Sequence, residues 1–173
     1  IVHLIFLCAN ALKSLTFDQY IRFREGAELL IEEDGKLSLF EFNLKYLVFY
    51  PLDIAFGLRQ EPKIAYFDIA SIATETSIAL SATIYDQYQD DGKAQEAFEK
   101  ISEISNVLAY IPSERILNQT LDRAYNAIQQ ADEGTKRRII DWALKCVQSD
   151  KVTSAGEIET IHALRSALGL GYL

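Results

Sequence analysis

The chain has 173 residues, is 49% hydrophobic and carries a formal net charge of −8. A chain of this length buries a sizeable core, so a single domain over residues 1–173 is the expected organisation. The acidic balance argues against nucleic acid as a partner, because phosphate binding needs clustered Lys and Arg. The one basic cluster, Lys136 to Arg138, stands at the start of a predicted helix, and we interpret it as surface.

The composition favours helix throughout. Only 3 Pro and 8 Gly occur among many Ala, Leu, Ile, Glu and Gln residues. Strand patterns are almost lacking. The short run from Ile64 to Phe67 could form a strand, but it has no evident partner strand. The predicted fold class is therefore all-α, a single bundle of about seven or eight helices.

In the first half, apolar periodicity predicts four helices. They run from Val2 to Leu12, from Thr16 to about Glu33, from Ser38 to just before Pro51, and from Phe67 to about Gln87. Thr16 and Gln19 form a capping box at the second of these helices. The fourth is rich in small residues, which indicates close packing at the centre of the bundle.

The second half begins with the clearest predicted loop, Gln89 to Lys93, which we expect to be the most mobile point. Helices are then predicted from Ala94 to Tyr110, from Arg115 to Gln130, from Lys136 to Ser149, and from Ser154 to Leu168.

One pattern occurs twice, 116 residues apart. Each copy holds Asp, Ser and Glu at relative positions 0, 4 and 7, first as Asp34, Ser38 and Glu41 and then as Asp150, Ser154 and Glu157. In Ser-x-x-Glu, the Ser hydroxyl and the Glu carboxylate each accept a hydrogen bond from a backbone amide of the first turn. The pattern predicts a repeated unit of helix, acidic turn and capped helix, and duplication and convergence both account for it. Apolar positions before the turn also match, such as Leu30 with Cys146.

The acidic turns suggest a divalent cation site without fitting an EF-hand. If Gly35 is the invariant loop glycine, Leu30 takes the first ligand position and cannot bind a cation, and the second copy has Lys151 where Gly is required. A looser site remains open if the two turns meet, with ligands from Asp34, Glu41, Asp150 and Glu157. The other interpretation is that these side chains cap helices and end turns. No other cofactor is expected.

No catalytic motif is evident. The chain has two His, His3 and His162, and no His-Glu-x-x-His. Cys8 and Cys146 each lie in an apolar run, which is typical of buried cysteines in a reducing compartment. A nucleophile would need a Cys or Ser beside a base, and no local pattern indicates one. We therefore expect this chain not to be an enzyme.

An aromatic group covers more than one face of the third predicted helix. It comprises Phe40, Phe42, Tyr46, Phe49 and Tyr50. One interpretation places part of the group in the core with the Tyr hydroxyls at the surface. The other makes it a docking surface for another domain.

Two stretches resemble a segment that follows the catalytic part of HtpX-like, CAAX-protease-related bacterial membrane zinc metallopeptidases. The first runs from Leu15 to Phe42, with Glu33-Asp34-Gly35-Lys36-Leu37-Ser38 at its centre. The second runs from Lys136-Arg137-Arg138 to Ala167-Leu168-Gly169. The stretch from Leu52 to Asn118 matches only in its helix pattern.

That segment is similar to TerB-like domains, which are all-helical and bind metal through acidic residues. The resemblance places such ligands on Asp34, Glu41, Asp150 and Glu157, although Lys151 and Gly156 depart from the pattern. It implies a non-catalytic accessory domain C-terminal to a membrane-bound zinc metallopeptidase, on the cytoplasmic side of the bacterial inner membrane. Its expected partner is the protease domain of the parent chain or another protein. The alternative is a divalent-metal-binding or stress-sensing module.

The chain begins at Ile1 and contains no Met, so we expect it to be a piece of a longer membrane protein. No membrane span is predicted within the piece itself, because no apolar run approaches the roughly 20 residues that a spanning helix needs.

Overall fold

The computed structural model describes residues 8, 11–32, 38–100, 106–147 and 155–170. Within them the chain forms seven α-helices and two short 3₁₀ helices, and no β-strand, so the all-α prediction is confirmed. The α-helices are α2 (Phe17–Glu32), α3 (Leu39–Ala55), α4 (Ala73–Tyr88), α5 (Asp91–Glu99), α7 (Asn118–Gln129), α8 (Glu133–Val147) and α9 (Ala155–Ala167). The 3₁₀ helices are η1 (Ala70–Ile72) and η2 (Ser113–Arg115).

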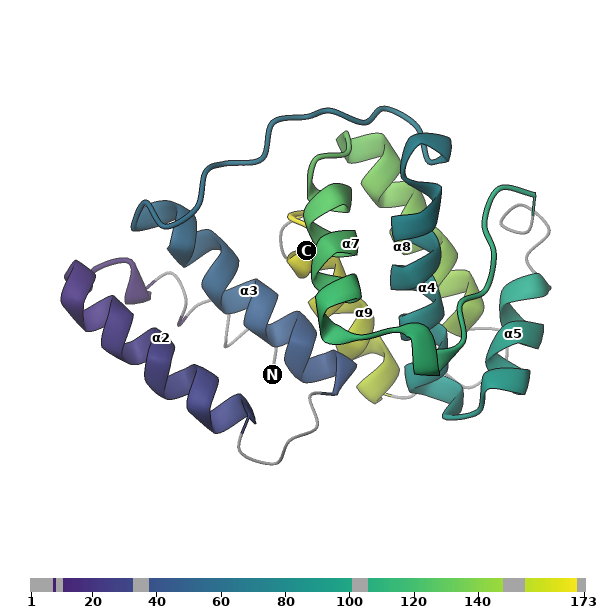
Figure 1. The fold of residues 1–173 in the computed structure, drawn as a ribbon, viewed down its shortest axis with the longest axis horizontal. Helices are drawn as coiled ribbons and strands as arrows, with labels where there is room; N and C mark the ends of the chain where they lie inside the picture. Colours follow the sequence, from purple (N-terminus) through teal and green to yellow (C-terminus); the bar gives the residue numbers. More distant parts are fainter. Residues whose placement is uncertain (1–7, 9–10, 33–37, 101–105, 148–154, 171–173) are drawn as a thin grey trace.

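Helix α4 stands at the centre of the bundle and packs against α3, α5, α7 and α8 (Figure 1). Its buried positions are mostly small, namely Thr76, Ser77, Ala79, Ser81, Ala82 and Thr83. Small side chains let neighbouring backbones approach closely, so the centre fills with larger side chains from other helices, such as Tyr125 and Phe98. The expected central position of this helix is confirmed, but the helix begins at Ala73 and not at Phe67, since residues 67–69 are not helical and Ala70–Ile72 form η1.

Helices α3 and α9 form the most extensive helix pair outside this centre. They run in the same direction, so their N-terminal ends lie at the same end of the pair (Figure 1). Buried Leu47 of α3 packs against Ala163 of α9, with Phe40 and Leu44 beside them. Helix α2 lies along the outer side of α3, at the edge of the molecule (Figure 1).

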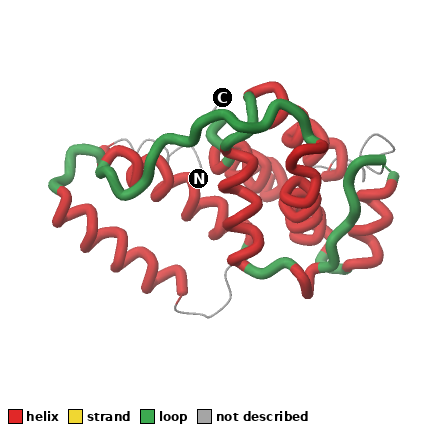
Figure 2. Tube along the Cα trace, turned by 45° about the horizontal axis from the view of Figure 1, so that its top comes forward, coloured by secondary structure: helices red, strands yellow, loops and turns green. Residues whose placement is uncertain are grey.

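The segment of residues 56–69, called the strap here, links α3 to η1 across one end of the molecule (Figure 2). Ala65 and Tyr66 donate backbone hydrogen bonds to the carbonyl of Gln130, and Asp132 donates to the carbonyl of Tyr66. Tyr66 and Ala131 thereby form an isolated parallel bridge between the strap and the turn that joins α7 to α8.

Helix α3 continues past the proline at which it was expected to stop. It contains Pro51 and ends at Ala55, followed by Phe56 as C-cap. Pro lacks the amide that would bond to the carbonyl of Leu47, so local sequence disfavours this course. Tertiary contacts outweigh that cost, because Leu52 and Asp53 in the extra turn are both buried.

The segment around α5 also differs from the prediction. The expected loop from Gln89 to Lys93 is almost all helix or cap, since Asp90 is the N-cap of α5 and accepts from the amide of Lys93. The helix ends at Glu99 instead of Tyr110, and residues 106–112 are not helical.

The N-terminal region lies mostly outside the described residues, and with it most of the helix predicted from Val2 to Leu12. Cys8 is described and is exposed, so the prediction that it is buried is wrong, whereas Cys146 is buried as expected. Leu30 is also exposed, although its repeat counterpart Cys146 is fully buried. Burial therefore does not follow the repeat at this position. In the described part of the chain, no helix combines the length and apolar character that a membrane crossing requires.

Candidate functional site

The first acidic turn ends in the predicted capping box. The Glu41 amide donates to the Ser38 hydroxyl at 3.2 Å, and the Ser38 amide donates to the Glu41 carboxylate at 2.9 Å. These bonds lower the pKa of Glu41, with the backbone bond from Ser38 as the largest cause. The cap of α2 is also confirmed, because Thr16 and Gln19 exchange the same pair of bonds.

The proposed cation ligands are only partly described. Asp34 and Asp150 lie outside the described residues, as do Ser154 and the side chain of Glu157. Glu41 is thus the one candidate ligand that the structure describes, and one of its oxygens already serves the cap. Among the described residues, no group of three or more His, Cys, Asp or Glu is close enough together to hold a metal ion.

Cys146, the described thiol that is buried, lies in an environment that disfavours nucleophilic reactivity. Burial raises the pKa of the Cys146 thiol to about 12, which keeps it protonated and unreactive at neutral pH. His162 lies on α9, and His3 is outside the described residues.

The aromatic group is largely core. Phe42, Tyr46 and Phe49 are buried, while Phe40 and Tyr50 are half-buried. The rings of Phe42 and Tyr46 each meet the ring of Tyr125 edge-on, at centroid distances of 5.2 and 5.1 Å. The interpretation of the group as core thus holds for these buried rings, and Tyr46, Phe49 and Tyr50 also line a pocket.

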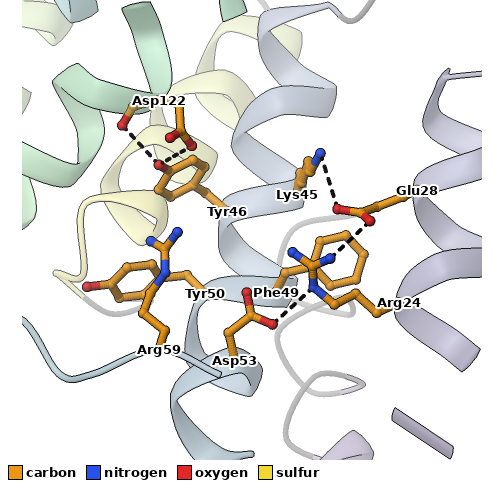
Figure 3. A pocket seen from close by; sticks show the side chains of 9 residues that line it. All are labelled: Arg24, Glu28, Lys45, Tyr46, Phe49, Tyr50, Asp53, Arg59 and Asp122. Atoms are coloured by element: carbon orange, nitrogen blue, oxygen red, sulfur yellow. Dashed lines mark hydrogen bonds and ion pairs between the residues drawn. The ribbon is translucent and has the colours of Figure 1, made fainter. Parts of the chain in front are cut away.

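That pocket lies between α2, α3, the start of the strap and α7, and has a volume of about 170 Å³ (Figure 3). It is lined by three cationic, three carboxylate and three aromatic side chains: Arg24, Lys45, Arg59, Glu28, Asp53, Asp122, Tyr46, Phe49 and Tyr50.

On the side of α2, the pocket charges are paired. Arg24 donates from Nε to Asp53 at 3.1 Å and from Nη1 to Glu28 at 3.0 Å, while Lys45 Nζ lies 3.5 Å from the other oxygen of Glu28. The Arg24 guanidinium also stands 5.5 Å from the ring centre of Phe49. The adjacent carboxylates Asp53 and Glu28 outweigh the effect of burial and raise the pKa of Arg24, so its charge is fixed.

Asp53 of α3 holds the α2 side of the pocket through contacts with residues of α2. Its carboxylate is buried and also accepts a hydrogen bond of 2.5 Å from the Tyr20 hydroxyl. Burial and the carboxylate together raise the pKa of Tyr20. The ring of Tyr20 stacks on Phe56 with centroids 4.4 Å apart, which fixes α2 against the end of α3.

On the side of α7, hydrogen bonds connect Tyr46 to Arg59 through Asp122 and Asn126, and Figure 3 shows the first of them, between Tyr46 and Asp122. The Tyr46 hydroxyl donates to Asp122 Oδ1 at 2.7 Å, Asn126 Nδ2 donates to Asp122 Oδ2 at 3.1 Å, and Arg59 Nη1 donates to Asn126 Oδ1 at 2.8 Å. The Arg59 guanidinium covers the ring of Tyr50 at 4.8 Å from its centre.

Chemically, the pocket is suited to binding. It offers donors and acceptors of both charges on aromatic walls, and burial raises the pKa of Tyr46, so this hydroxyl stays protonated and acts as a donor. Small-molecule sites commonly combine apolar walls with a few polar groups that fix orientation.

Sequence reasoning found only the aromatic part of this pocket. Its charged members come from positions as far apart as Arg24 and Asp122, and only a fold places such residues together. The available local pattern was the i, i+4 spacing of Arg24 with Glu28, which is common on any helix surface.

No protein-family model, no curated protein and no solved structure matches this chain.

Proposed function

We propose that this chain is a non-catalytic interaction module that docks on the zinc metallopeptidase part of a longer bacterial membrane protein, at the cytoplasmic side of the inner membrane. The observation that carries the proposal is the pair Leu29 and Leu30 at the end of α2, which are 72% and 74% exposed. Isolated surface leucines are common, but adjacent ones that leave this much apolar area in water favour an interaction site.

The attachment of α2 supports this role. The side of α2 that faces α3 is held by Tyr20, Phe23 and Arg24, through stacking, an edge-on ring contact with Phe49 and ion pairs. These contacts fix the helix in place and leave its terminal leucines uncovered. The ordered resemblance of both ends of the chain to a segment that follows a metallopeptidase domain suggests what covers them.

The test is site-specific photocrosslinking in the full parent chain in native membranes. A photoreactive amino acid replaces Leu30, and a matched control replaces Glu96, which is exposed on α5 at the opposite side of the molecule from α2 (Figure 1). We expect the probe at position 30 to crosslink to the peptidase domain and the probe at position 96 to give little product.

Equal crosslinking from both positions, or none from position 30, would contradict docking through these leucines. The parent reading frame provides a separate check. A parent without membrane spans or without an upstream His-Glu-x-x-His motif would rule out the metallopeptidase partner.

A second candidate is the TerB-like cation site, and the arrangement of α3 and α9 favours it. Both acidic turns precede helices that begin at the same end of this pair. The test is calorimetry with calcium, magnesium, manganese and zinc. The double variant Asp34→Asn with Glu41→Gln should abolish saturable binding, whereas Glu114→Gln, exposed on η2, should leave it unchanged. Absence of saturable heat in the unmodified protein would rule the site out.

A further inference from the structure

Two pocket residues of opposite charge stand apart from the ion pairs around them. Arg24, Lys45, Glu28 and Asp53 all have an ionic partner within the pocket. Arg59 and Asp122 have none among the described residues, although both line the same cavity.

Asn126 holds these two charges at a fixed separation. Its amide oxygen accepts from Arg59 at 2.8 Å, and its amide nitrogen donates to Asp122 at 3.1 Å. The amide thus occupies one donor of the guanidinium and one acceptor position of the carboxylate.

Both charged groups retain capacity for a ligand. A guanidinium has five N–H donors. Arg59 uses one of them for Asn126, and its guanidinium also interacts with the hydroxyls of Tyr46 and Tyr50. A carboxylate has about four lone-pair sites, and Tyr46 and Asn126 use two of those on Asp122. The contact with the Tyr50 ring and the hydrogen bond to Asn126 restrict the Arg59 side chain, so less of its freedom is lost when a ligand binds.

We propose that this pocket binds a free α-amino acid, with the ligand carboxylate on Arg59 and the ligand ammonium on Asp122. Planar guanidinium matches carboxylate in a bidentate geometry, and a carboxylate is the natural partner of an ammonium group. The rings of Tyr46, Phe49 and Tyr50 provide apolar surface for the ligand side chain.

Size and charge favour a compact ligand with no net charge. A cavity of about 170 Å³ is smaller than the roughly 300–1,000 Å³ of sites for drug-sized molecules, so only a compact ligand fits. The cavity lining carries three cationic and three carboxylate side chains, so its formal charge sums to zero and it offers no net attraction to a dianion such as inorganic phosphate. A ligand with one charge of each sign meets both unpaired groups and adds no net charge.

The test is isothermal titration calorimetry with three related compounds at millimolar concentration. Free leucine carries both charged groups, 4-methylpentanoate lacks the ammonium, and 3-methylbutylamine lacks the carboxylate. We expect leucine to bind at least tenfold more tightly than either analogue. Inorganic phosphate should give no saturable heat.

Variants assign each contact. Arg59→Gln and Asp122→Asn should each weaken leucine binding at least tenfold, and Arg59→Gln should leave the affinity for 3-methylbutylamine unchanged. The control is Arg137→Gln, since Arg137 is exposed on α8 and pairs with Glu133 away from the pocket. Circular dichroism confirms that each variant is folded, and Arg59→Lys and Asp122→Glu serve as second variants that keep the charge.

Three results would overturn the proposal: no saturable heat with leucine, equal affinity for 4-methylpentanoate, or leucine binding that survives both Arg59→Gln and Asp122→Asn. The docking proposal depends on Leu29 and Leu30, so its failure and the failure of this one are distinguishable.

Discussion

At the scale of single residues, Asp53 decides how α2 joins the rest of the molecule. One buried carboxylate accepts from Tyr20 and from Arg24, both on α2, while its own residue belongs to the last turn of α3. Hydrogen bonds to a charged group are stronger than neutral ones, and a buried ion needs them to offset its lost hydration.

Asp53→Asn should therefore lower the free energy of unfolding by about 1–3 kcal/mol, because Arg24 loses its buried partner and the bond from Tyr20 loses its charge. Urea denaturation measures this change. Asp141→Asn is the matched control, since Asp141 is exposed on α8. A loss no larger than in the control would show that Asp53 does not hold the two helices together.

Tyr46 makes the stability of the folded protein depend on pH in the alkaline range. Burial, followed by the hydrogen bond to Asp122, raises its pKa in the folded state above the value of about 10 for a free tyrosine. The folded state thus holds this proton more tightly than the unfolded state. Its contribution to stability is complete below about pH 10 and is lost as the pH rises further.

Tyr46→Phe should make the free energy of unfolding fall less steeply above about pH 10, because one of the tyrosines with a raised pKa is removed. Denaturation series from pH 8 upward measure the slope. The slope is the readout, because loss of the hydroxyl also lowers stability at every pH. An unchanged slope would contradict the assigned role of Tyr46.

At the scale of elements, α3 shows how tertiary contacts override a local stop. A proline in a helix interior removes one backbone hydrogen bond and crowds the preceding turn, yet the turn after Pro51 carries buried Leu52 and Asp53. The burial of Leu52 and Asp53 therefore offsets the free-energy cost of a proline inside the helix.

Pro51→Ala should raise the free energy of unfolding by up to about 3 kcal/mol, because alanine restores the amide and relieves the crowding within the helix. Thermal and urea unfolding measure the gain. A loss of stability would mean that the proline ring itself packs well enough to outweigh the backbone defect.

Much of the helical pattern follows from the sequence, since apolar spacing and caps are local. Ser38 with Glu41 and Thr16 with Gln19 marked two helix starts correctly. The end of α5 was missed for a non-local reason. Spacing that includes Phe98 and Val107 favours one continuous helix, but Val107 is 47% exposed and lies in an irregular segment.

Contacts with α4 and α5 hold that irregular segment. The amides of Ala109 and Ile111 donate to the hydroxyls of Ser77 and Ser81 on α4, and Tyr110 donates to Asp91 on α5. None of these partners is near in sequence, so periodicity cannot reveal them. The pocket was missed for the same reason, because Arg59 and Asp122 come together only in the folded chain.

At the scale of the whole molecule, the helices differ in how extensively they pack against their neighbours. Helix α4 is enclosed by four others, whereas α2, as far as the described residues show, packs along one side and lies at the edge (Figure 1). Regions with fewer buried contacts open with a smaller free-energy cost than the centre.

Native-state hydrogen exchange should show this difference directly. We expect amides in the middle of α2 to exchange through local opening, at a lower free energy than those of α4, which should require global unfolding. Equal protection of the two helices would show that the polar contacts at Asp53 couple α2 fully to the bundle.

The strap is the covalent link between α3 and the central helices, and it lies on the outside of the molecule. Arg59 is half-buried, but Gln60 through Ala65 are exposed, while α3 keeps its own contacts with α9 and α4. This part of the backbone connects α3 to the central helices but contributes little to holding them together. A protease that cuts after Lys63 should yield two fragments that remain associated, so the fold is suited to complementation between separately expressed halves.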